Sequence, residues 1–377
     1  MNFIDLKTQQ NRIREGLKVR FDRILEHGAY IMGPEVIELE EKLAEYCGVK
    51  HAISCSSGTD ALLIPLMAWN IGPGDAVFTT PFTYVATAEV ISLLGATPVF
   101  VDVYESTFNI DCEKLESAIQ HTISEGKLTP KAIIPVDLFG VPARYRIIEE
   151  IAKKYDLKVI EDAAQSFGGA IRDKKVGTFG DVAATSFYPA KPLGCYGDGG
   201  AIFTNNDNLA EKCKAIRIHG TTSDKYNSEL IGLNGRLDSI QAAVLLEKLT
   251  IFDEELDLRQ NISNQYRKNI NNCQYIPNDY ISSHALFSVV LDSEEERNKK
   301  IEELKENQIP TVVYYKYPIH LMKGFAYLGY QKGDFPISEQ LSQTIVSLPM
   351  HPYLHQNDID QVIESIKVID NFSTDKD

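Results

Sequence analysis

Seven short apolar runs follow one another between residues 51 and 205, and this pattern limits the possible folds more than any other feature. The runs are HAISCSS, AVFTTP, TPVFVDV, AIIPV, KVIED, VAATSF and AIFTN. Most of them precede a segment that is long enough for a helix. Strands that alternate with helices form a largely parallel sheet with helices on its faces. The sequence therefore predicts an α/β/α layer around a mainly parallel seven-stranded sheet.

The pattern changes beyond about residue 250, which indicates a second, smaller part. Its predicted elements are a long helix over 247–271, a strand in HALFSVVLD, a helix over 294–307, a strand in TVVYYKY and a helix near 358–372. A chain of 377 residues also exceeds what one simple core usually supports. We expect a large α/β domain over residues 1–250, whose N-terminal segment is free to pack elsewhere, and a small α+β domain over residues 251–377.

Charge and cysteine content argue against several classes of function. The net charge of −15 is the opposite of the basic surface that nucleic-acid binding needs. The six cysteines are dispersed, with no CxxC pair and no histidine at metal-ligand spacing, so we expect reduced thiols and no metal site. The N-terminal stretch has no apolar signal region, and no apolar run is long enough to span a membrane. We expect a soluble, cytoplasmic protein.

One lysine is unusually confined. Lys191 follows the apolar run VAATSF, lies between Pro189 and Pro192, and precedes a glycine-rich loop that ends in GDGG. Proline restricts the chain, and glycine lets other backbone approach closely. Such a loop suits an amine that must be held, desolvated and aimed, as a Schiff-base lysine must be. An ordinary surface lysine at the end of a loop is the alternative, and this loop alone does not decide between them.

Two further stretches also follow predicted strands. Ser56-Ser57-Gly58-Thr59 stands where a strand turns into a helix, and the free amides of a helix N-terminus form a seat for phosphate. The alternative is that these residues only cap the helix. In the stretch TTPFTYVAT, either Phe82 or Tyr84 has a ring that can stack on a planar ligand, or that packs under the loop.

The acidic pair Glu161-Asp162 ends another predicted strand and precedes Ala163-Ala164-Gln165-Ser166. A buried carboxylate is costly unless a cation or a strong donor pairs with it. A protonated pyridine nitrogen is such a partner. A metal ion is a rival partner, but no histidine or second carboxylate cluster accompanies the pair. An anion seat, an aromatic ring, a buried acid and a confined lysine are together what a pyridoxal phosphate site requires.

The sequence resembles the DegT/DnrJ/EryC1/StrS group of sugar-nucleotide aminotransferases. The resemblance covers essentially the whole chain, from FIDLKTQQ to VSLPMHPYL, and its specific motifs are SSGTDAL, PFTYVATA, EDAAQSFG, SFYPAKPLGCYGDGGA and NGRLDSIQAAVL. It implies the aspartate-aminotransferase-like architecture (fold type I) with pyridoxal phosphate as the cofactor. A related branch that dehydrates sugars carries histidine in place of the lysine, so Lys191 argues for transamination.

The resemblance also implies site residues. Lys191 would be the catalytic lysine that binds the cofactor, and the other expected cofactor contacts are Asp162 at the pyridine nitrogen, Gln165 near the ring hydroxyl, Tyr84 on the ring, and Gly58, Thr59 and Ser186 at the phosphate. Asn234 would reach the phosphate of a neighbouring subunit. A homodimer with active sites shared across the interface is therefore expected.

The resemblance ranks substrates without fixing one. Tyr188 stands where many members that aminate C4 have histidine, and the GDGG ending is similar to members that act on 3-keto sugars. We expect a UDP- or dTDP-linked 3-keto sugar, with glutamate as the amino donor and an amino sugar for polysaccharide or glycan biosynthesis as the product. A 4-keto sugar is the alternative. Candidate substrate contacts are His320, His351, Arg236 and Tyr188, although each histidine also suits a structural hydrogen bond and Arg236 an ion pair at the subunit interface.

Two other classes of protein share parts of this pattern. A pyridoxal phosphate protein that does not transaminate, such as a lyase or a regulatory binder, would keep the same cofactor residues. A Rossmann-type oxidoreductase would keep the alternation of strands and helices, but no GxGxxG opens a helix after an early strand.

Overall fold

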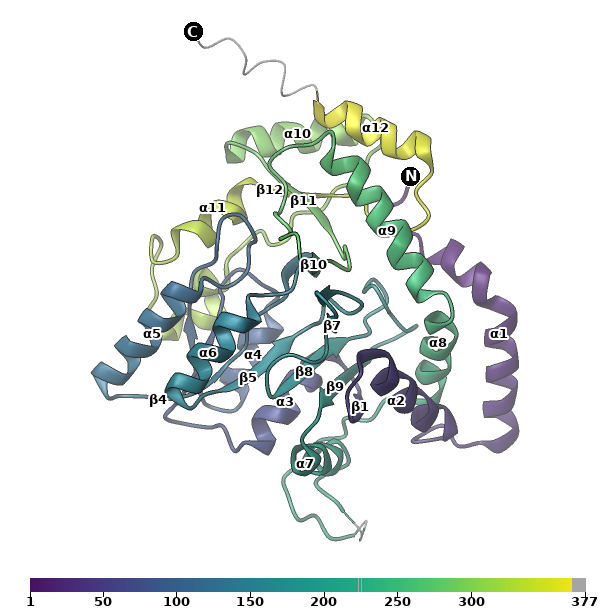
Figure 1. Ribbon diagram of the computed structural model, residues 1–377, viewed down its shortest axis with the longest axis vertical. Coiled ribbons are helices and arrows are strands. Elements are labelled where there is room, and N and C mark those ends of the chain that lie inside the picture. Colours follow the sequence, from purple (N-terminus) through teal and green to yellow (C-terminus); the bar gives the residue numbers. More distant parts are fainter. Residues whose placement is uncertain (223, 225, 368–377) are drawn as a thin grey trace.

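The computed structural model describes residues 1–222, 224 and 226–367. Its central sheet has seven strands in the order β1-β9-β8-β5-β4-β2-β3. They are β1 (His51–Cys55), β2 (Asp75–Thr79), β3 (Thr97–Phe100), β4 (Thr129–Ile133), β5 (Lys158–Asp162), β8 (Val182–Ser186) and β9 (Gly200–Thr204). Five of them, β1, β9, β8, β5 and β4, are labelled in Figure 1. All seven predicted strands are confirmed.

The sheet is parallel except at β9, which runs antiparallel to both β8 and β1. The segment between β8 and β9 contains no helix, so the chain turns back directly and does not cross over to the far end of the sheet. That returning segment, residues 187–199, contains Lys191 and the glycine-rich loop. The reversal of β9 therefore brings the loop to the edge where β8 ends.

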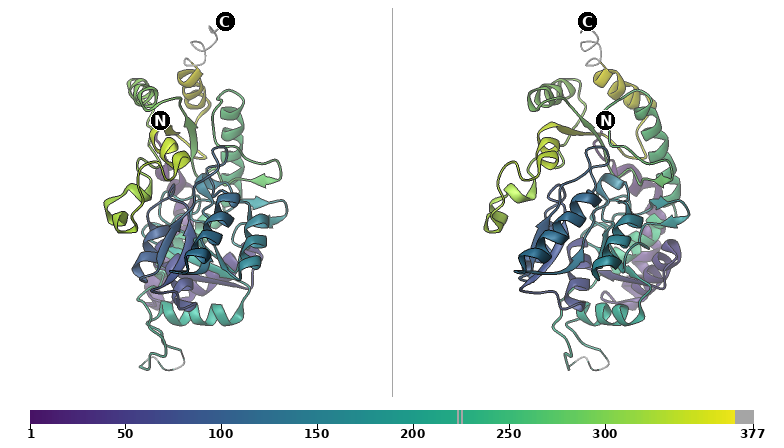
Figure 2. Two further views of the ribbon diagram at one scale, coloured as in Figure 1. Left: turned by 90° about the vertical axis from the view of Figure 1, so that its left-hand side faces the viewer. Right: turned by 60° about the vertical axis from the view of Figure 1, so that its left-hand side comes forward.

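Helices lie on both faces of the sheet (Figure 2). Alternate residues of the strands pack against them. The core on one face includes α3 (Gly58–Ala68), α4 (Ala86–Leu93) and α7 (Asp207–Arg217). The opposite face is covered by α5 (Cys112–Glu125), α6 (Tyr145–Tyr155), α2 (Pro34–Cys47) and α8 (Ser239–Leu249). Helix α1 (Leu6–His27) lies outside α8. The predicted α/β/α layer is therefore confirmed.

The C-terminal part is smaller and gathers at one end of the molecule (Figure 1). The antiparallel pair β11 (Phe287–Val290) and β12 (Ile345–Leu348) packs with α9 (Phe252–Arg267), α10 (Glu294–Glu306) and α12 (Gln356–Lys367). Helix α11 (Pro336–Thr344) precedes β12, and the short strands β6 (Ala170–Ile171), β7 (Lys174–Lys175) and β10 (Tyr280–Ile281) form a separate small sheet. Met1 packs against this C-terminal core. The division of the chain at residue 250 stays a prediction.

Two predicted elements were wrong. The long helix expected over 247–271 is two helices, because the chain breaks between α8 and α9, where the Thr250 hydroxyl donates to the Glu247 carbonyl at 2.6 Å. The strand expected in TVVYYKY contributes only a single bridge, between Val312 and Ser347. The last predicted helix begins at Gln356, and the part of that prediction beyond residue 367 lies outside the described residues. Among the described helices, none has the length and the hydropathy to cross a membrane.

Candidate active site

The four stretches singled out in the sequence lie at one edge of the sheet. Strands β1, β2, β5 and β8 run in the same direction, so the residues that follow them emerge at their common C-terminal edge. Strand β9 begins at the same edge, with Gly199 and Gly200. Ligands of open α/β sheets bind at this edge. We therefore regard it as the candidate active site.

Asp162 is buried at the end of β5, with 4% of its surface exposed. Its Oδ2 accepts a hydrogen bond from the Thr87 hydroxyl at 2.8 Å, and its Oδ1 accepts one from the Ala164 amide at 3.2 Å. Burial raises the pKa of Asp162, and these two hydrogen bonds and the charge of Lys191 oppose that effect. The carboxylate is thus oriented by two donors and suits a cationic partner.

Lys191 lies in the loop after β8 and is half-buried. Its amide donates to the Tyr188 carbonyl at 2.9 Å, and the loop closes where the Cys195 amide donates to the Phe187 carbonyl at 2.7 Å. Burial lowers the pKa of Lys191 to about 8, although the charge of Asp162 favours the ammonium form. A larger fraction of this amine is therefore neutral near neutral pH than for an exposed lysine, and the neutral amine is the nucleophile.

The N-terminus of α3 packs closely against β8 and β9. A Cβ added to Gly58 would lie 2.6 Å from the Cβ of Ser186, and a Cβ added to Gly200 would lie 2.3 Å from the Ser57 carbonyl oxygen. Ser57 caps the helix by accepting from the Asp60 amide at 3.0 Å. The cap and the anion seat are compatible, because capping leaves the first amides of the helix, at Gly58 and Thr59, outside the helical ladder.

The structure separates the two aromatic candidates. Phe82 is fully buried and makes edge-to-face contacts with Phe139 and Tyr315. Tyr84 is 59% exposed, and its ring centroid lies 6.4 Å from that of Tyr315. Of the two, only Tyr84 has a ring available to a ligand.

Gln165 forms a hydrogen bond with a tyrosine that the sequence analysis did not predict to lie in the site. Its Oε1 accepts from the Phe139 amide at 2.9 Å, and its Nε2 donates to the Tyr315 hydroxyl at 3.0 Å. Tyr315 comes from the C-terminal part, and only the fold brings it beside Gln165. Thr87, the donor to Asp162, was also missed, although it belongs to the PFTYVATA stretch, because nothing in its spacing marks which hydroxyl faces the acid.

Asn234 and Arg236 lie beside the turn that leads into α3. The Ser56 amide donates to the Gly235 carbonyl at 3.0 Å, and Arg236 Nη2 donates to Asn234 Oδ1 at 2.5 Å. Asn234 is exposed, as is Tyr188 on the lysine loop at 56%. The expected contact of Asn234 with a neighbouring subunit's phosphate stays a prediction, as do the substrate contacts of Arg236 and Tyr188.

The two candidate histidines have partners inside the chain. His320 is 2% exposed, and its Nε2 lies 3.1 Å from Glu339 Oε1. His351 is 3% exposed, and its Nε2 lies 3.1 Å from the Asn2 carbonyl oxygen. Burial lowers the pKa of His351 to about 4, so this imidazole is neutral at physiological pH. Contact of either histidine with substrate stays a prediction.

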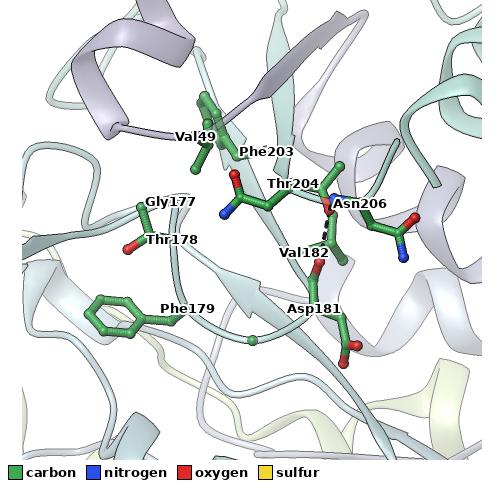
Figure 3. Close-up of a pocket in the computed structure, with 11 residues that line it drawn as sticks. Val49, Gly177, Thr178, Phe179, Asp181, Val182, Phe203, Thr204 and Asn206 are labelled. Atoms are coloured by element: carbon green, nitrogen blue, oxygen red, sulfur yellow. Dashed lines mark hydrogen bonds between the residues drawn. The ribbon is translucent and has the colours of Figure 1, made fainter. Parts of the chain in front are cut away.

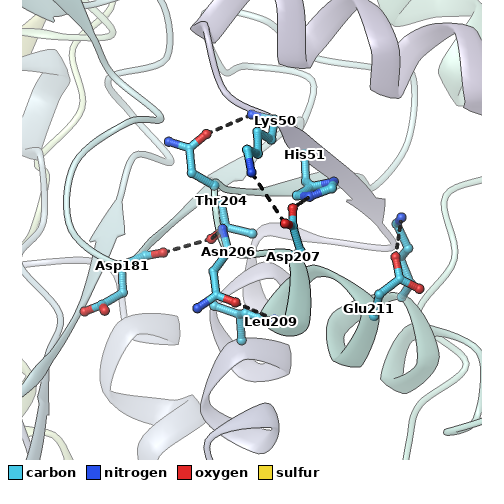
Figure 4. A network of polar contacts seen from close by, with 10 residues as sticks. Lys50, His51, Asp181, Thr204, Asn206, Asp207, Leu209 and Glu211 are labelled. Atoms are coloured by element: carbon cyan, nitrogen blue, oxygen red, sulfur yellow. Dashed lines mark hydrogen bonds and ion pairs between the residues drawn. The ribbon is translucent and has the colours of Figure 1, made fainter.

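A cavity of about 370 Å³ lies at the opposite edge of the sheet, where β8 begins and β9 ends (Figure 3). Polar groups that line it or lie near it make contacts within the chain. The Thr204 hydroxyl donates to the Asp181 carbonyl at 2.9 Å, and Lys50 Nζ and His51 Nε2 lie 3.4 and 2.7 Å from the Asp207 carboxylate (Figure 4). These groups are occupied by internal contacts, so the chemistry is better placed at the edge that holds Lys191.

Known proteins resemble the chain over almost its whole length. A model of the DegT/DnrJ/EryC1/StrS aminotransferase family matches residues 11–367. A UDP-2-acetamido-2-deoxy-3-oxo-D-glucuronate aminotransferase from Pseudomonas aeruginosa is 46% identical over 360 residues, which cover 94% of this chain and 96% of that protein. A dTDP-3-amino-3,6-dideoxy-alpha-D-galactopyranose transaminase from Aneurinibacillus thermoaerophilus is 39% identical, with 97% and 98% coverage.

Solved structures agree with these relatives. A DegT DnrJ EryC1 StrS aminotransferase from Brucella abortus superimposes with a TM-score of 0.94 at 48% identity, over 98% of this chain and 99% of that one. A putative sugar aminotransferase from Streptococcus pneumoniae, solved in its PLP form, superimposes with a TM-score of 0.87 at 26% identity, over 95% and 96% of the two chains. The predicted aminotransferase fold of type I is confirmed.

Proposed function

The chain belongs to the DegT/DnrJ/EryC1/StrS aminotransferase family, and from this premise we propose that it transfers the amino group of glutamate to a 3-keto sugar linked to UDP or dTDP. It is a sugar-nucleotide transaminase that uses pyridoxal phosphate. The choice of a 3-keto sugar rests on one observation: both relatives described above are named for chemistry at C3 of the sugar. The product is an amino sugar nucleotide for polysaccharide or glycan biosynthesis. A 4-keto sugar is the alternative acceptor.

The residues at the sheet edge fit this cofactor. Gly58 lies so close to Ser186 that no side chain fits at position 58. The first amides of α3 are therefore not covered by a side chain of that residue, as a phosphate seat requires. Asp162 is a buried acid held by two donors, and Lys191 is an amine whose pKa is lowered by burial. These three features support an assignment of the phosphate to the N-terminus of α3, of the ring nitrogen to Asp162 and of the aldehyde to Lys191.

When bound, pyridoxal phosphate would supply an aldehyde that takes up the donor's amino group and a ring that accepts electrons. Lys191 Nζ would hold the cofactor through that aldehyde and, once the amino donor has displaced it, would take the proton from the donor's Cα as a general base. It returns a proton as a general acid in the half-reaction with the keto sugar. Asp162 keeps the ring nitrogen protonated, and Thr87 and Ala164 keep the Asp162 carboxylate in place. Tyr84 would cover the ring, and Gln165 would lie near its hydroxyl.

A homodimer is part of the proposal. Asn234 is exposed beside the turn that leads into α3 and would reach the phosphate of the partner subunit. An active site completed by a second chain would give this exposed amide a partner.

Gly58→Ala should weaken cofactor binding by about fivefold to about 100-fold, since overpacking typically costs about 1–3 kcal/mol and about 1.4 kcal/mol corresponds to a factor of ten. The new Cβ would lie 2.6 Å from Ser186, within the proposed phosphate seat. The measurement is the dissociation constant of pyridoxal phosphate, by fluorescence titration of the cofactor-free protein. Gly324→Ala is the matched control, because a Cβ at Gly324 meets nothing within 4 Å. Equal affinities of the Gly58→Ala variant and the wild type would contradict the placement of the phosphate.

The proposed function is tested with the purified, cofactor-loaded protein. Glutamate should be converted to 2-oxoglutarate in an amount equal to the protein, and a UDP- or dTDP-linked 3-keto sugar should then give the amino sugar nucleotide, detected by mass spectrometry. Matched 4-keto sugars should react at least about tenfold more slowly, a discrimination within the range that pocket contacts provide. Faster reaction of the 4-keto sugar would replace the proposed acceptor. Failure of glutamate to give 2-oxoglutarate would remove glutamate as the donor.

A further inference from the structure

The loop that carries Lys191 rests on one face of α8. The Tyr196 amide donates to Gln241 Oε1 at 2.9 Å, and the Tyr196 ring packs with Val244. One turn further along the helix, Lys248 Nζ lies 4.7 Å from the centre of the Tyr196 ring. Residues three and four positions apart share a helix face, so these three residues form a continuous support for Tyr196.

Lys248 is buried more completely than a lysine usually is. It is 1% exposed, and within the described part of the chain its Nζ has no hydrogen-bond partner. A buried ammonium is costly unless something compensates its charge. The face of the Tyr196 ring provides such compensation, because a cation over a desolvated aromatic ring is attracted to it. The remaining N–H groups of Lys248 are of the kind that buried water satisfies.

Glu255, on α9, is the carboxylate whose charge acts on Lys248. Burial lowers the pKa of Lys248 to about 8, and the charge of Glu255 opposes this shift. Glu255 is itself held from two other elements: Gln9 Nε2 of α1 donates to its Oε2 at 2.7 Å, and the Tyr353 hydroxyl of the C-terminal part bonds to its Oε1. Glu255 therefore connects α9 with α1 and with the C-terminal part.

A second buried lysine, Lys300, shows that a buried lysine does not need an aromatic ring as its partner. Lys300, on α10, is 3% exposed, but its Nζ donates to the Ser365 carbonyl at 3.1 Å and lies 2.6 Å from Glu303. Lys300 is thus satisfied by Glu303 on its own helix and by a carbonyl of α12. Lys248 instead faces an aromatic ring on the loop that holds Lys191.

We propose that Lys248 is a positioning residue: its ammonium, held between the Tyr196 ring and the charge of Glu255, fixes the loop that carries Lys191 against α8. This role rests on the proposed function, since it concerns the lysine that binds the cofactor. Tyr196 is five residues from Lys191, and Cys195, which precedes it, closes the same loop on Phe187. Loss of the Lys248 contact loosens this closure and lets Lys191 leave its position.

Hydrogen exchange of the loop tests the proposal directly. In Lys248→Met, which keeps the length of the side chain and removes the charge, exchange of the Cys195 and Tyr196 amides should be about tenfold faster than in the wild type. The matched control Lys300→Met should leave these amides unchanged, although it also removes a buried lysine. The measurement is made by mass spectrometry on the cofactor-loaded and the cofactor-free protein. An unchanged loop in Lys248→Met, or an equally loosened loop in Lys300→Met, would overturn the proposal.

Variants of Tyr196 test the same contact with Lys248 in place. Tyr196→Phe keeps the ring and should keep the slow exchange of Cys195, whereas Tyr196→Leu should lose it. Adding Lys248→Met to Tyr196→Leu should change the exchange rate less than about twofold, because the two residues share one contact. Equal exchange rates of Cys195 in Tyr196→Phe and Tyr196→Leu would show that the contact of Lys248 with the aromatic ring does not hold the loop. That result would refute the proposal.

A kinetic readout separates positioning from general stability. In Lys248→Met, kcat should fall about tenfold while the KM for glutamate changes less than about twofold, because positioning acts on the chemical step. A rise in KM with unchanged kcat would contradict the role. The exchange measurement does not require the cofactor to be bound to Lys191. The two proposals can therefore fail separately. If the protein attaches no cofactor to lysine, the proposed function fails. If amide exchange in the loop is nevertheless slow in the wild type and faster in Lys248→Met, the contact of Lys248 with the loop is still established.

Discussion

Lys191→Ala should lower kcat by about 10⁴-fold or more, since the variant loses both the covalent hold on the cofactor and the general acid–base. Lys191 is the residue at the sheet edge that combines an amine with the burial that lowers its pKa to about 8. The variant should fold normally, because removal of a partly desolvated amine removes a cost of folding as well as a contact. The measurement is single-turnover conversion of glutamate to 2-oxoglutarate.

Lys191→Arg is the matched control for charge. It keeps the positive charge opposite Asp162 but lacks an amine that can bond to the aldehyde. It should be as inactive as the alanine variant. Activity within about tenfold of the wild type in either variant would show that another group performs the acid–base chemistry, because one such group is typically worth about 10²–10⁴-fold.

Asp162→Asn should reduce kcat by about 10²–10⁴-fold, which corresponds to the roughly 3–5 kcal/mol lost when one partner of a buried ion pair is removed, at 1.4 kcal/mol for each factor of ten. The amide has nearly the same shape but no charge to keep the ring nitrogen protonated. The hydrogen bonds from Thr87 and Ala164 show that the site holds this side chain in one orientation. The measurement is kcat with glutamate, together with the pH dependence of the cofactor absorbance.

Glu161→Gln is the matched control for that variant. Glu161 precedes Asp162 on β5 and is fully buried, but it faces the other side of the strand, where it accepts from the Gly177 and Phe179 amides at distances of 3.0–3.2 Å. The change should lower the free energy of unfolding by about 1–3 kcal/mol, because it disturbs buried hydrogen bonds, and leave kcat nearly unchanged. Equal losses of kcat in the two variants would contradict the specific role of Asp162.

Most of the fold was predictable because the strands carry their signal locally. Each run from HAISC to AIFT is apolar, short and bounded by polar or glycine residues, so its type and limits follow from nearby residues. The break between α8 and α9 was not predictable in the same way. No glycine or proline marks Thr250, and the side chains around it suit a helix on either side.

The candidate site was predictable only where its residues follow strands directly. Asp162 ends β5, and Gly58 and Lys191 lie in the short segments after β1 and β8, so the common edge of the sheet brings them together. Tyr315 and Lys248 do not follow strands of the central sheet. Their partners, Gln165 and Tyr196, lie far away in the sequence, and only packing of the C-terminal part and of α8 makes these pairs. For the same reason, the sequence could not show that His320 has an internal partner in Glu339.

The attachment point of the cofactor is the most direct test of the account. The protein is loaded with pyridoxal phosphate, reduced with sodium borohydride to make any lysine–cofactor bond permanent, digested, and mapped by mass spectrometry. Lys248 is an internal comparison, since burial also lowers its pKa to about 8. We predict one phosphopyridoxyl group per chain, on the peptide that contains Lys191. Attachment to Lys248 or to any other lysine in place of Lys191, or no attachment at all, would contradict the central claim.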